Sequence, residues 1–267
     1  LFVGAEGTLG VITELTVRLH PIPETITAAL CAFPTVGDAV RAVIEAVQYG
    51  LPMARVEFLD AVAIAGVNAY SKLSMTVAPT LMFEFHGTEA WAAEQARLVQ
   101  EIAAEHGGSD FTWTADEEER TRLWQARHDL YWATKAQRPG CELYTADICV
   151  PISQLAGQIE AARTDIEASP LIGQIIGHVG DGNYHAAYLV MPGDPAEMAE
   201  AARLADRLVE RALQVHGTAS GEHGIGLGKL KFLRAEHGDA AVEAMKAVKA
   251  ALDPKSILNP GKMGMAG

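Results

Sequence analysis

The sequence predicts an α+β protein in which strands and helices interleave along most of the chain. Apolar residues make up 49% of the 267 positions and charged residues 21%, the composition of a globular protein with a sizeable core. Stretches with apolar residues at alternate positions are separated by stretches with apolar residues three and four apart. Two strand-like stretches also flank GDGN at 180–183, which is typical of a hairpin. Because a hairpin is antiparallel, we favour an α+β sheet over the alternative, a parallel α/β sheet.

The first twenty residues are expected to form a strand, a glycine turn and a second strand. In the second strand, apolar or β-branched side chains recur at every other position: Val11, Thr13, Leu15, Val17 and Leu19. Pro21 and Pro23 interrupt any regular element and set a boundary near residue 24. The chain begins at Leu1 and runs directly into the glycine turn, so we interpret it as the C-terminal part of a longer protein. Any targeting signal would then precede Leu1.

Turn and capping residues delimit the elements after this boundary. Strands are expected over 27–33, 55–59, 80–85 and 143–150 and on both sides of GDGN. Helices are expected from Thr35 to Gly50, over 60–69, 89–105 and 116–136, after Pro151, over 194–215, and in two stretches between 228 and 251. Thr35 followed by Asp38 has capping-box spacing. The tail 252–263 should be extended, because two prolines interrupt it.

Composition and charge exclude several classes of protein. The net charge of −13 argues against a nucleic-acid partner, because such binding needs clustered Lys and Arg. No apolar run approaches the roughly 20 residues that a membrane-spanning helix requires. Cys31, Cys141 and Cys149 form no Cys-x-x-Cys pair and fit a reducing compartment. We therefore expect a cytoplasmic protein with no transmembrane segment; peripheral attachment to a membrane is the alternative.

The segment GHVGDGNYH contains two candidate metal ligands. If Asp181 and Gly182 are the central residues of a type I′ turn, His178 faces His185 across the hairpin. Their Cβ atoms would then lie about 5 Å apart. Two imidazoles at that spacing can share one metal ion at roughly 2.1 Å each. The alternative is a stacked pair of surface histidines.

A second candidate segment is TASGEHGIGLGK at 218–229. Its four glycines permit irregular backbone, which can bring neighbouring side chains to one side. Glu222 is a candidate third ligand that would complete a His2Glu set with one open position, and His223 is a candidate general base beside it. The alternative is a glycine-rich turn with a solvated acid. Charged residues in GEHGIGLG argue against a dinucleotide-binding fingerprint.

The motifs GAEGTLGVIT, HVGDGNYH, GEHGIG and LNPGKM occur in this order, and together they resemble the FAD-linked oxidases of the vanillyl-alcohol-oxidase type. The resemblance covers the whole chain and is strongest to the D-lactate dehydrogenase branch, through ARVEFLDAVAIAGVNAYSKL, LWQARHDLYWATKAQRPGCELYTADICVPIS and GEHGIGLGK. It implies that residues 1–24 end a FAD-binding domain whose remainder precedes Leu1. Residues 25–267 would form the substrate domain, a ferredoxin-like antiparallel sheet with helices on one face.

The resemblance also implies roles for single residues. FAD contacts are implied for Gly4, Glu6, Gly7, Gly10 and Asn259. The family's divalent-metal ligands are matched by His178, His185 and Glu222. Its catalytic base is matched by His223, and Arg127 matches the arginine that holds the substrate carboxylate. Guanidinium and carboxylate form bidentate pairs, so this role suits arginine.

These roles imply a flavoenzyme that oxidises a D-2-hydroxy acid to its 2-oxo acid. Arg127 would bind the carboxylate, a metal would lower the pKa of the 2-hydroxyl, and His223 would remove its proton while hydride passes to FAD. Two His and one Glu suit Zn²⁺ and Mn²⁺ equally. The electron acceptor would be a cytochrome or a quinone.

Two positions bear on the choice of substrate. The related D-2-hydroxyglutarate dehydrogenases carry a lysine two residues before the acid that Asp147 matches, and an asparagine two residues after the second histidine. Here these positions hold Thr145 and Ala187, so a distal carboxylate would lack partners and D-lactate fits better. Glycolate and D-2-hydroxyglutarate are alternatives within the family. Outside it, the alternatives are a His2Glu metallohydrolase and a non-catalytic module that keeps a metal for stability.

Overall fold

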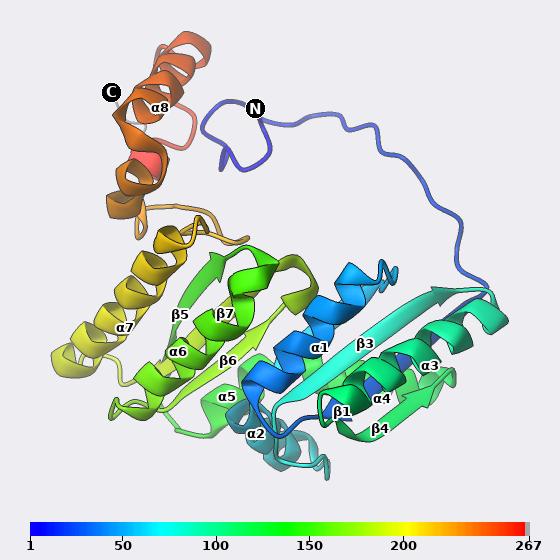
Figure 1. The fold of residues 1–267 in the computed structure, drawn as a ribbon. Helices are drawn as coiled ribbons and strands as arrows, with labels where there is room; N and C mark the ends of the chain where they lie inside the picture. The colour runs from blue at the N-terminus through cyan, green and yellow to red at the C-terminus, as the bar shows by residue number, and fades with distance from the viewer. Residues whose placement is uncertain (265–267) are drawn as a thin grey trace.

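The computed structural model describes residues 1–264, and a seven-stranded antiparallel sheet lies at its centre (Figure 1). The strand order is β4-β1-β3-β2-β6-β7-β5. The strands are β1 (Thr25–Ala32), β2 (Arg55–Leu59), β3 (Thr80–Gly87), β4 (Ser109–Thr114), β5 (Glu142–Cys149), β6 (Gly173–Gly177) and β7 (Asn183–Val190). The antiparallel sheet confirms the predicted α+β class over the parallel alternative.

Eight α-helices and three 3₁₀ turns connect and cover these strands within residues 1–264. The helices are α1 (Val36–Gln48), α2 (Ala61–Ser71), α3 (Glu89–Glu105), α4 (Glu117–His128), α5 (Leu130–Ala136), α6 (Leu155–Glu167), α7 (Pro195–Gln214) and α8 (Leu230–Leu252). The 3₁₀ turns are η1 (Ile152–Gln154), η2 (Val179–Asp181) and η3 (Lys262–Gly264). As predicted, the Thr35 side chain caps α1 by accepting a hydrogen bond from Asp38 N, at 3.1 Å.

The sheet is built from two similar units. In the first, β1-α1-β2-β3-α3-β4, with α2 inserted between β2 and β3, gives the spatial order β4-β1-β3-β2, which is the ferredoxin-like arrangement that the resemblance implied. In the second, β5-α6-β6-β7-α7 repeats the pattern as β6-β7-β5, and β2 pairs with β6 to join the units. The fourth strand of the second unit is reduced to one bridge between Cys149 and Thr218. The loop that follows this bridge carries Glu222 and His223.

Alternate residues on each strand divide the sheet into two faces. On β2, Val56 and Phe58 enter the larger core, which is packed against α1, α3, α6 and α7. Leu59 points to the other face, where α2, α4 and α5 cover a smaller core. Helices therefore lie on both faces of the sheet, and the expectation that they cover only one face is wrong. Where the smaller core ends, this second face carries buried polar side chains instead: Glu57, Asp147, Gln174 and His185.

Several elements differ from the prediction. Residues 1–3 form no strand, and residues 253–264 contain turns and η3 instead of running extended. Strand β4 was not predicted, and the helix predicted over 116–136 is two helices that meet at Asp129. The strand predicted over 11–19 is wrong, because this segment has no strand and its apolar side chains are exposed, among them Leu15 at 73% and Leu19 at 85%. Alternation alone does not make a strand; the backbone also needs a neighbour to pair with, and no strand of residues 1–264 lies beside this segment.

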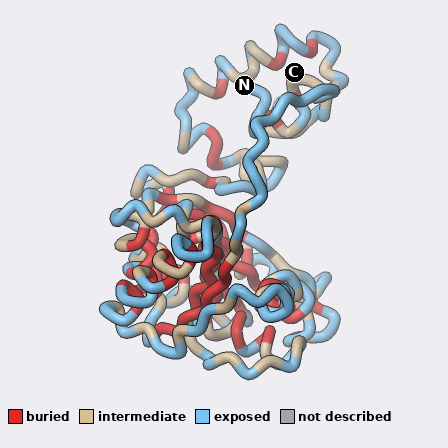
Figure 2. The backbone as a smooth tube through the Cα atoms, turned by 90° about the vertical axis from the view of Figure 1, so that its right-hand side faces the viewer, coloured by how far each residue is buried: buried red, intermediate tan, exposed pale blue. Residues whose placement is uncertain are grey.

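The N-terminal loop and the segment that follows α8 meet away from the sheet. Lys249 of α8 is buried, donates hydrogen bonds to the carbonyl oxygens of Thr8 and Leu258, both at 2.8 Å, and pairs with Asp253. Figure 1 shows the N-terminal loop beside α8, and Figure 2 shows that this part is far less buried than the sheet. Within residues 1–264, none of the helices is both long and apolar enough to cross a lipid bilayer.

Candidate metal and substrate site

His178 and His185 lie at one end of the β6–β7 pair, but the predicted register between them is wrong by two residues. Ile176, and not His178, is the cross-strand partner of His185. A type I′ turn needs positive φ at both central residues; Gly182 has φ 80°, whereas Asp181 belongs to the 3₁₀ turn η2. A shift of two residues keeps side chains on the same face, so the two rings still meet, 5.5 Å apart and nearly perpendicular.

Asp147 of β5 holds the loop that carries Glu222 and His223. One of its oxygens, Oδ2, accepts hydrogen bonds from Glu222 N at 3.0 Å and His223 N at 2.9 Å, and Oδ1 accepts one from Asn183 Nδ2 at 2.8 Å. The loop passes so close that a Cβ at Gly221 would lie 1.8 Å from Asn183 Nδ2 and 2.6 Å from Asp147 Oδ1. Only glycine fits at this position. The irregular backbone predicted for the segment therefore allows the loop to approach Asp147 closely.

Asp147 also lies behind His185. The two residues are direct cross-strand partners on β5 and β7, and His185 Nδ1 lies 3.3 Å from Asp147 Oδ1. Burial alone would raise the pKa of Asp147, but its contacts with His185 and with the loop amides hold that pKa far below its usual range. Lys229 also donates to the Asp147 carbonyl oxygen, at 2.7 Å. Asp147 is therefore a buried carboxylate that remains ionised.

Glu57 of β2 has the corresponding place behind His178. Its Oε1 accepts a hydrogen bond from His178 Nδ1 at 2.8 Å, and its Oε2 lies 3.1 Å from both Nε and Nη2 of Arg127. Burial would raise the pKa of Glu57, but the bond from His178 and the charge of Arg127 hold it below its usual range. The same hydrogen bond raises the pKa of His178. Arg127, assigned to the substrate by resemblance, is therefore anchored beside the histidines.

The donor atoms of His178, His185 and Glu222 converge on one point. Glu222 Oε1 lies 3.4 Å from His178 Nε2 and 3.3 Å from His185 Nε2. Each histidine has a carboxylate at its Nδ1, Glu57 or Asp147, which leaves Nε2 free toward that point. A carboxylate behind a ligating imidazole is the usual outer shell of a metal site, so these residues fit a divalent ion.

His223 lies beside this group of donors and is half exposed. Its ring stacks on that of His185, with centroids 5.0 Å apart and planes 6° apart, and its Nε2 lies 3.5 Å from Glu222 Oε1. His223 could also form a second donor set with Asp147 and His185. In that set Asp147 would be a ligand, but both of its oxygens already accept hydrogen bonds from the loop amides and Asn183, so the first set fits better.

Sequence reasoning missed the supporting roles of Glu57 and Asp147. Both are charged residues that interrupt buried strand sequences, RVEFL and TADIC, and both are almost completely buried. A charge at a buried strand position needs a partner, and this is the signal that could have identified them.

The residues implied for FAD contact are only partly brought together. Glu6 Oε1 accepts hydrogen bonds from Ile225 N at 2.7 Å and Gly226 N at 3.0 Å, and the Asn259 side chain donates to the Glu6 carbonyl oxygen. The first turn and the C-terminal arm therefore both lie against the loop that carries His223. Glu6 supports this loop from one side, as Asp147 does from the other.

The three glycines of this group leave the turn accessible. Gly4 and Gly7 have φ of 78° and 70°; no atom lies within 4 Å of the position of a Cβ at Gly4, and at Gly7 only Asn259 Nδ2 does, at 3.9 Å. Gly10 lies apart, next to the Phe2 ring. These residues fit one edge of a cofactor site, since a ligand could approach the turn closely. They do not by themselves enclose a flavin.

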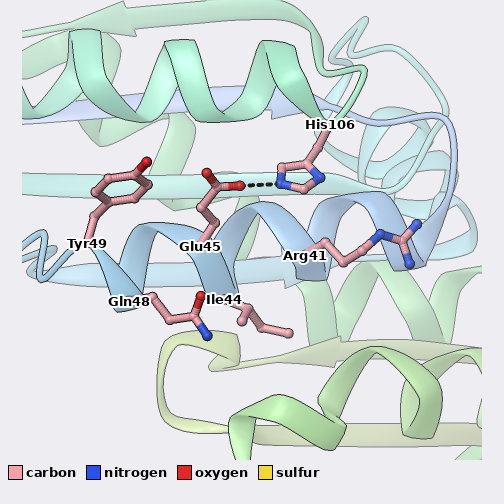
Figure 3. Close-up of a pocket in the computed structure, with 6 residues that line it drawn as sticks. All are labelled: Arg41, Ile44, Glu45, Gln48, Tyr49 and His106. Atoms are coloured by element: carbon pink, nitrogen blue, oxygen red, sulfur yellow. Dashed lines mark hydrogen bonds and ion pairs between the residues drawn. The ribbon is translucent and has the colours of Figure 1, made fainter.

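His106 pairs with a carboxylate away from this site. His106 ends α3 and its Nε2 lies 2.7 Å from Glu45 Oε2 of α1 (Figure 3). This pair borders a cavity of about 430 Å³ that is lined by Arg41, Ile44, Glu45, Gln48, Tyr49 and His106. Its side chains offer one imidazole and one carboxylate, so it has no convergent donor set like that around Glu222.

The sequence of this chain matches a known family over most of its length. Residues 22–263 match the model for the C-terminal domain of FAD linked oxidases. The chain belongs to this family. Its fold agrees with that of 4-ethylphenol oxidase from Gulosibacter chungangensis, with a TM-score of 0.70 and 15% identity over 93% of this chain and 55% of the oxidase. At this identity the likeness concerns the fold alone.

Several curated relatives match 98% of the chain. A protein of Danio rerio named "Probable D-lactate dehydrogenase, mitochondrial" is 49% identical, and the match covers 53% of it. The mitochondrial D-lactate dehydrogenase [cytochrome] of Arabidopsis thaliana is 45% identical with 46% covered, and a glycolate oxidase subunit of Escherichia coli is 33% identical with 52% covered. The chain thus spans about half the length of these relatives.

Proposed function

We propose that this chain is the substrate domain of a flavoenzyme that oxidises a D-2-hydroxy acid, with D-lactate as the preferred substrate. The observation that carries the proposal is the convergence of His178, His185 and Glu222 next to Arg127. Such a site offers two points of attachment for a hydroxy acid, a divalent ion for the hydroxyl and a guanidinium for the carboxylate. The relatives support it, because lactate and glycolate are both 2-hydroxy acids.

The proposal includes the domain organisation and the cofactor. Residues 1–24 would end a FAD-binding domain, and residues 25–267 would form the substrate domain. When bound, FAD accepts the hydride that leaves C2 of the substrate. The electrons would then pass to a cytochrome or a quinone. The cytoplasmic location stays a prediction, and fractionation of cells would test it against the mitochondrial location named for the relatives.

Each side chain has a defined task in this scheme. Arg127 binds the substrate carboxylate through the N–H groups that Glu57 leaves free. His178, His185 and Glu222 would hold Zn²⁺ or Mn²⁺, and when bound the ion acts as a Lewis acid that lowers the pKa of the 2-hydroxyl. His223 takes the hydroxyl proton. Fixing carboxylate and hydroxyl together presents one face of C2, and this selects the D isomer.

The substrate preference rests on two neighbouring positions. Thr145 and Ala187 are direct cross-strand partners, two residues along from the pair of Asp147 and His185 and therefore on the same face. Neither of these two side chains is charged, so neither would supply a cation to a second carboxylate of the substrate. We expect the protein to prefer D-lactate to D-2-hydroxyglutarate in kcat/KM; preference for the diacid would overturn the assignment of the substrate.

Three single substitutions in the intact enzyme test the assigned roles. His223→Ala should keep its metal but lower turnover of D-lactate by about 10²–10⁴-fold, as expected for a lost general base. Glu222→Ala should lose metal and activity together, whereas Arg127→Ala should chiefly raise KM. Full activity in His223→Ala would contradict the scheme. Bleaching of the flavin absorbance at about 450 nm by D-lactate without oxygen is expected, and metal-dependent hydrolysis without bleaching would indicate a metallohydrolase instead.

A further inference from the structure

Glu57 connects the two points that would hold the substrate. Its side chain is 7% exposed, and each of its carboxylate oxygens has a separate partner. Oε1 receives the hydrogen bond from His178 Nδ1, and Oε2 receives Arg127 Nε, with Nη2 at the same 3.1 Å. One rigid, buried group therefore lies between the candidate metal ligand on one side and the candidate carboxylate clamp on the other.

The contact on Arg127 determines which part of the guanidinium remains free. Arginine has five N–H donors in a fixed plane, and Glu57 occupies the edge formed by Nε and Nη2. The end of the group, formed by Nη1 and the second proton of Nη2, stays available for a bidentate carboxylate. The contact on His178 has a similar effect, because a proton held on Nδ1 leaves the lone pair of Nε2 toward Glu222.

We propose that Glu57 sets the distance between the carboxylate clamp and the metal, and so selects acids whose hydroxyl is on the carbon next to the carboxylate. This inference rests on the proposed function of the site. A 3-hydroxy acid places its hydroxyl one carbon further from the carboxylate. With both Arg127 and His178 fixed to the same side chain, the site cannot widen to accept it, so Glu57 is a positioning residue that determines specificity.

Shortening the side chain by one carbon tests this directly. Glu57→Asp keeps the charge but cannot reach both partners in the observed positions. We expect its Kd for Mn²⁺, measured by calorimetric titration of the metal-free protein, to rise about 10–100-fold, as for other groups behind metal ligands. We also expect kcat/KM for D-lactate to fall about 10²-fold, because a substrate misplaced by about 1 Å typically reacts that much more slowly. Most of this fall should be in kcat. The ratio of kcat/KM between D-lactate and D-3-hydroxybutyrate should fall as well.

Glu84 provides a matched control. It is also a buried glutamate on the same face of the neighbouring strand β3, and it is bonded to a histidine, His86 Nε2, at 2.7 Å. Glu84→Asp should leave the Mn²⁺ Kd and the substrate ratio unchanged. If Glu57→Asp does not fold, Glu57→Gln replaces it; this variant keeps the length but lacks the charge that holds Arg127, and its substrate ratio should fall similarly.

The outcomes separate this inference from the proposed function. Oxidation of D-lactate by the wild type, together with an unchanged Mn²⁺ Kd or an unchanged substrate ratio in Glu57→Asp, would overturn the role of Glu57 and leave the function standing. If the wild type oxidised neither acid, the proposed function and the selection of substrates would both be overturned. The Mn²⁺ Kd of Glu57→Asp would then still show whether Glu57 holds His178 in place.

Discussion

Replacing Asp147 by asparagine should weaken metal binding without unfolding the protein. The carboxylate accepts hydrogen bonds at both oxygens: Oδ2 accepts two from the loop amides of Glu222 and His223 and a longer one from Ser220 Oγ, and Oδ1 accepts one from Asn183. An asparagine of the same size has a single acceptor oxygen, so its amide nitrogen would face at least one N–H donor. The two loop amides would also donate to a neutral acceptor instead of a charged one. Each of these hydrogen bonds would be weaker by about 1 kcal/mol, because hydrogen bonds to charged groups are stronger by this amount.

The loss of about 2 kcal/mol corresponds to about a 30-fold change in an equilibrium constant. These bonds hold the backbone of Glu222, a candidate metal ligand. We therefore expect most of this loss of free energy to appear as a higher Kd for Mn²⁺, measured by calorimetric titration of the metal-free protein. The matched control is Asp206→Asn, since Asp206 is a partly exposed residue of α7 that pairs with Lys231, away from the site. A Kd for Asp147→Asn within twofold of the wild-type value, in a protein that melts normally, would refute the view that Asp147 holds the loop.

Three further predictions concern the rest of the fold. Phe58→Ala should lower the free energy of unfolding by about 3–5 kcal/mol in chemical denaturation, because Phe58 is completely buried where the two units join. A loss below about 1 kcal/mol would contradict its place in the core. Lys249→Met should make the backbone amides of the N-terminal loop exchange with deuterium about tenfold faster or more, because the hydrogen bond from Lys249 to the Thr8 carbonyl oxygen is lost. Unchanged exchange would show that other contacts hold the loop. Burial raises the pKa of Cys31 to about 11. Cys31 should therefore resist iodoacetamide at pH 8 in the native protein and react after unfolding, which mass spectrometry would show. Rapid labelling of the native protein would place Cys31 outside the core.

Local patterns were sufficient for most of the secondary structure. Helix α3 and strand β2 have the predicted bounds, because a capping residue, two glycines or a short apolar run defines each of them within a few neighbouring residues. Where the pattern was incomplete, the prediction was wrong. The alternation over 11–19 reads as a strand, yet the segment has no neighbour in residues 1–264, and hydrogen-bonded pairing cannot be seen in one segment alone.

The sequence by itself also identified His178, His185, Glu222 and His223 as a group, because their residue types and glycine-rich surroundings are unusual for a core or a plain turn. Only the tertiary structure decided how they meet. The register of β6 and β7 depends on a 3₁₀ turn that differs from the hairpin predicted from GDGN. The loop of Glu222 lies beside them because the second unit lacks a full fourth strand.

The carboxylates behind the histidines were decided by tertiary structure alone. Glu57 and His178 are 121 residues apart in the chain, and Asp147 and Glu222 are 75 apart. A buried charge in a strand shows that a partner must exist, but strand order and register determine which partner it is. The roles of these two carboxylates depend on β2 lying beside β6 and β5 beside β7, and the sequence records neither pairing.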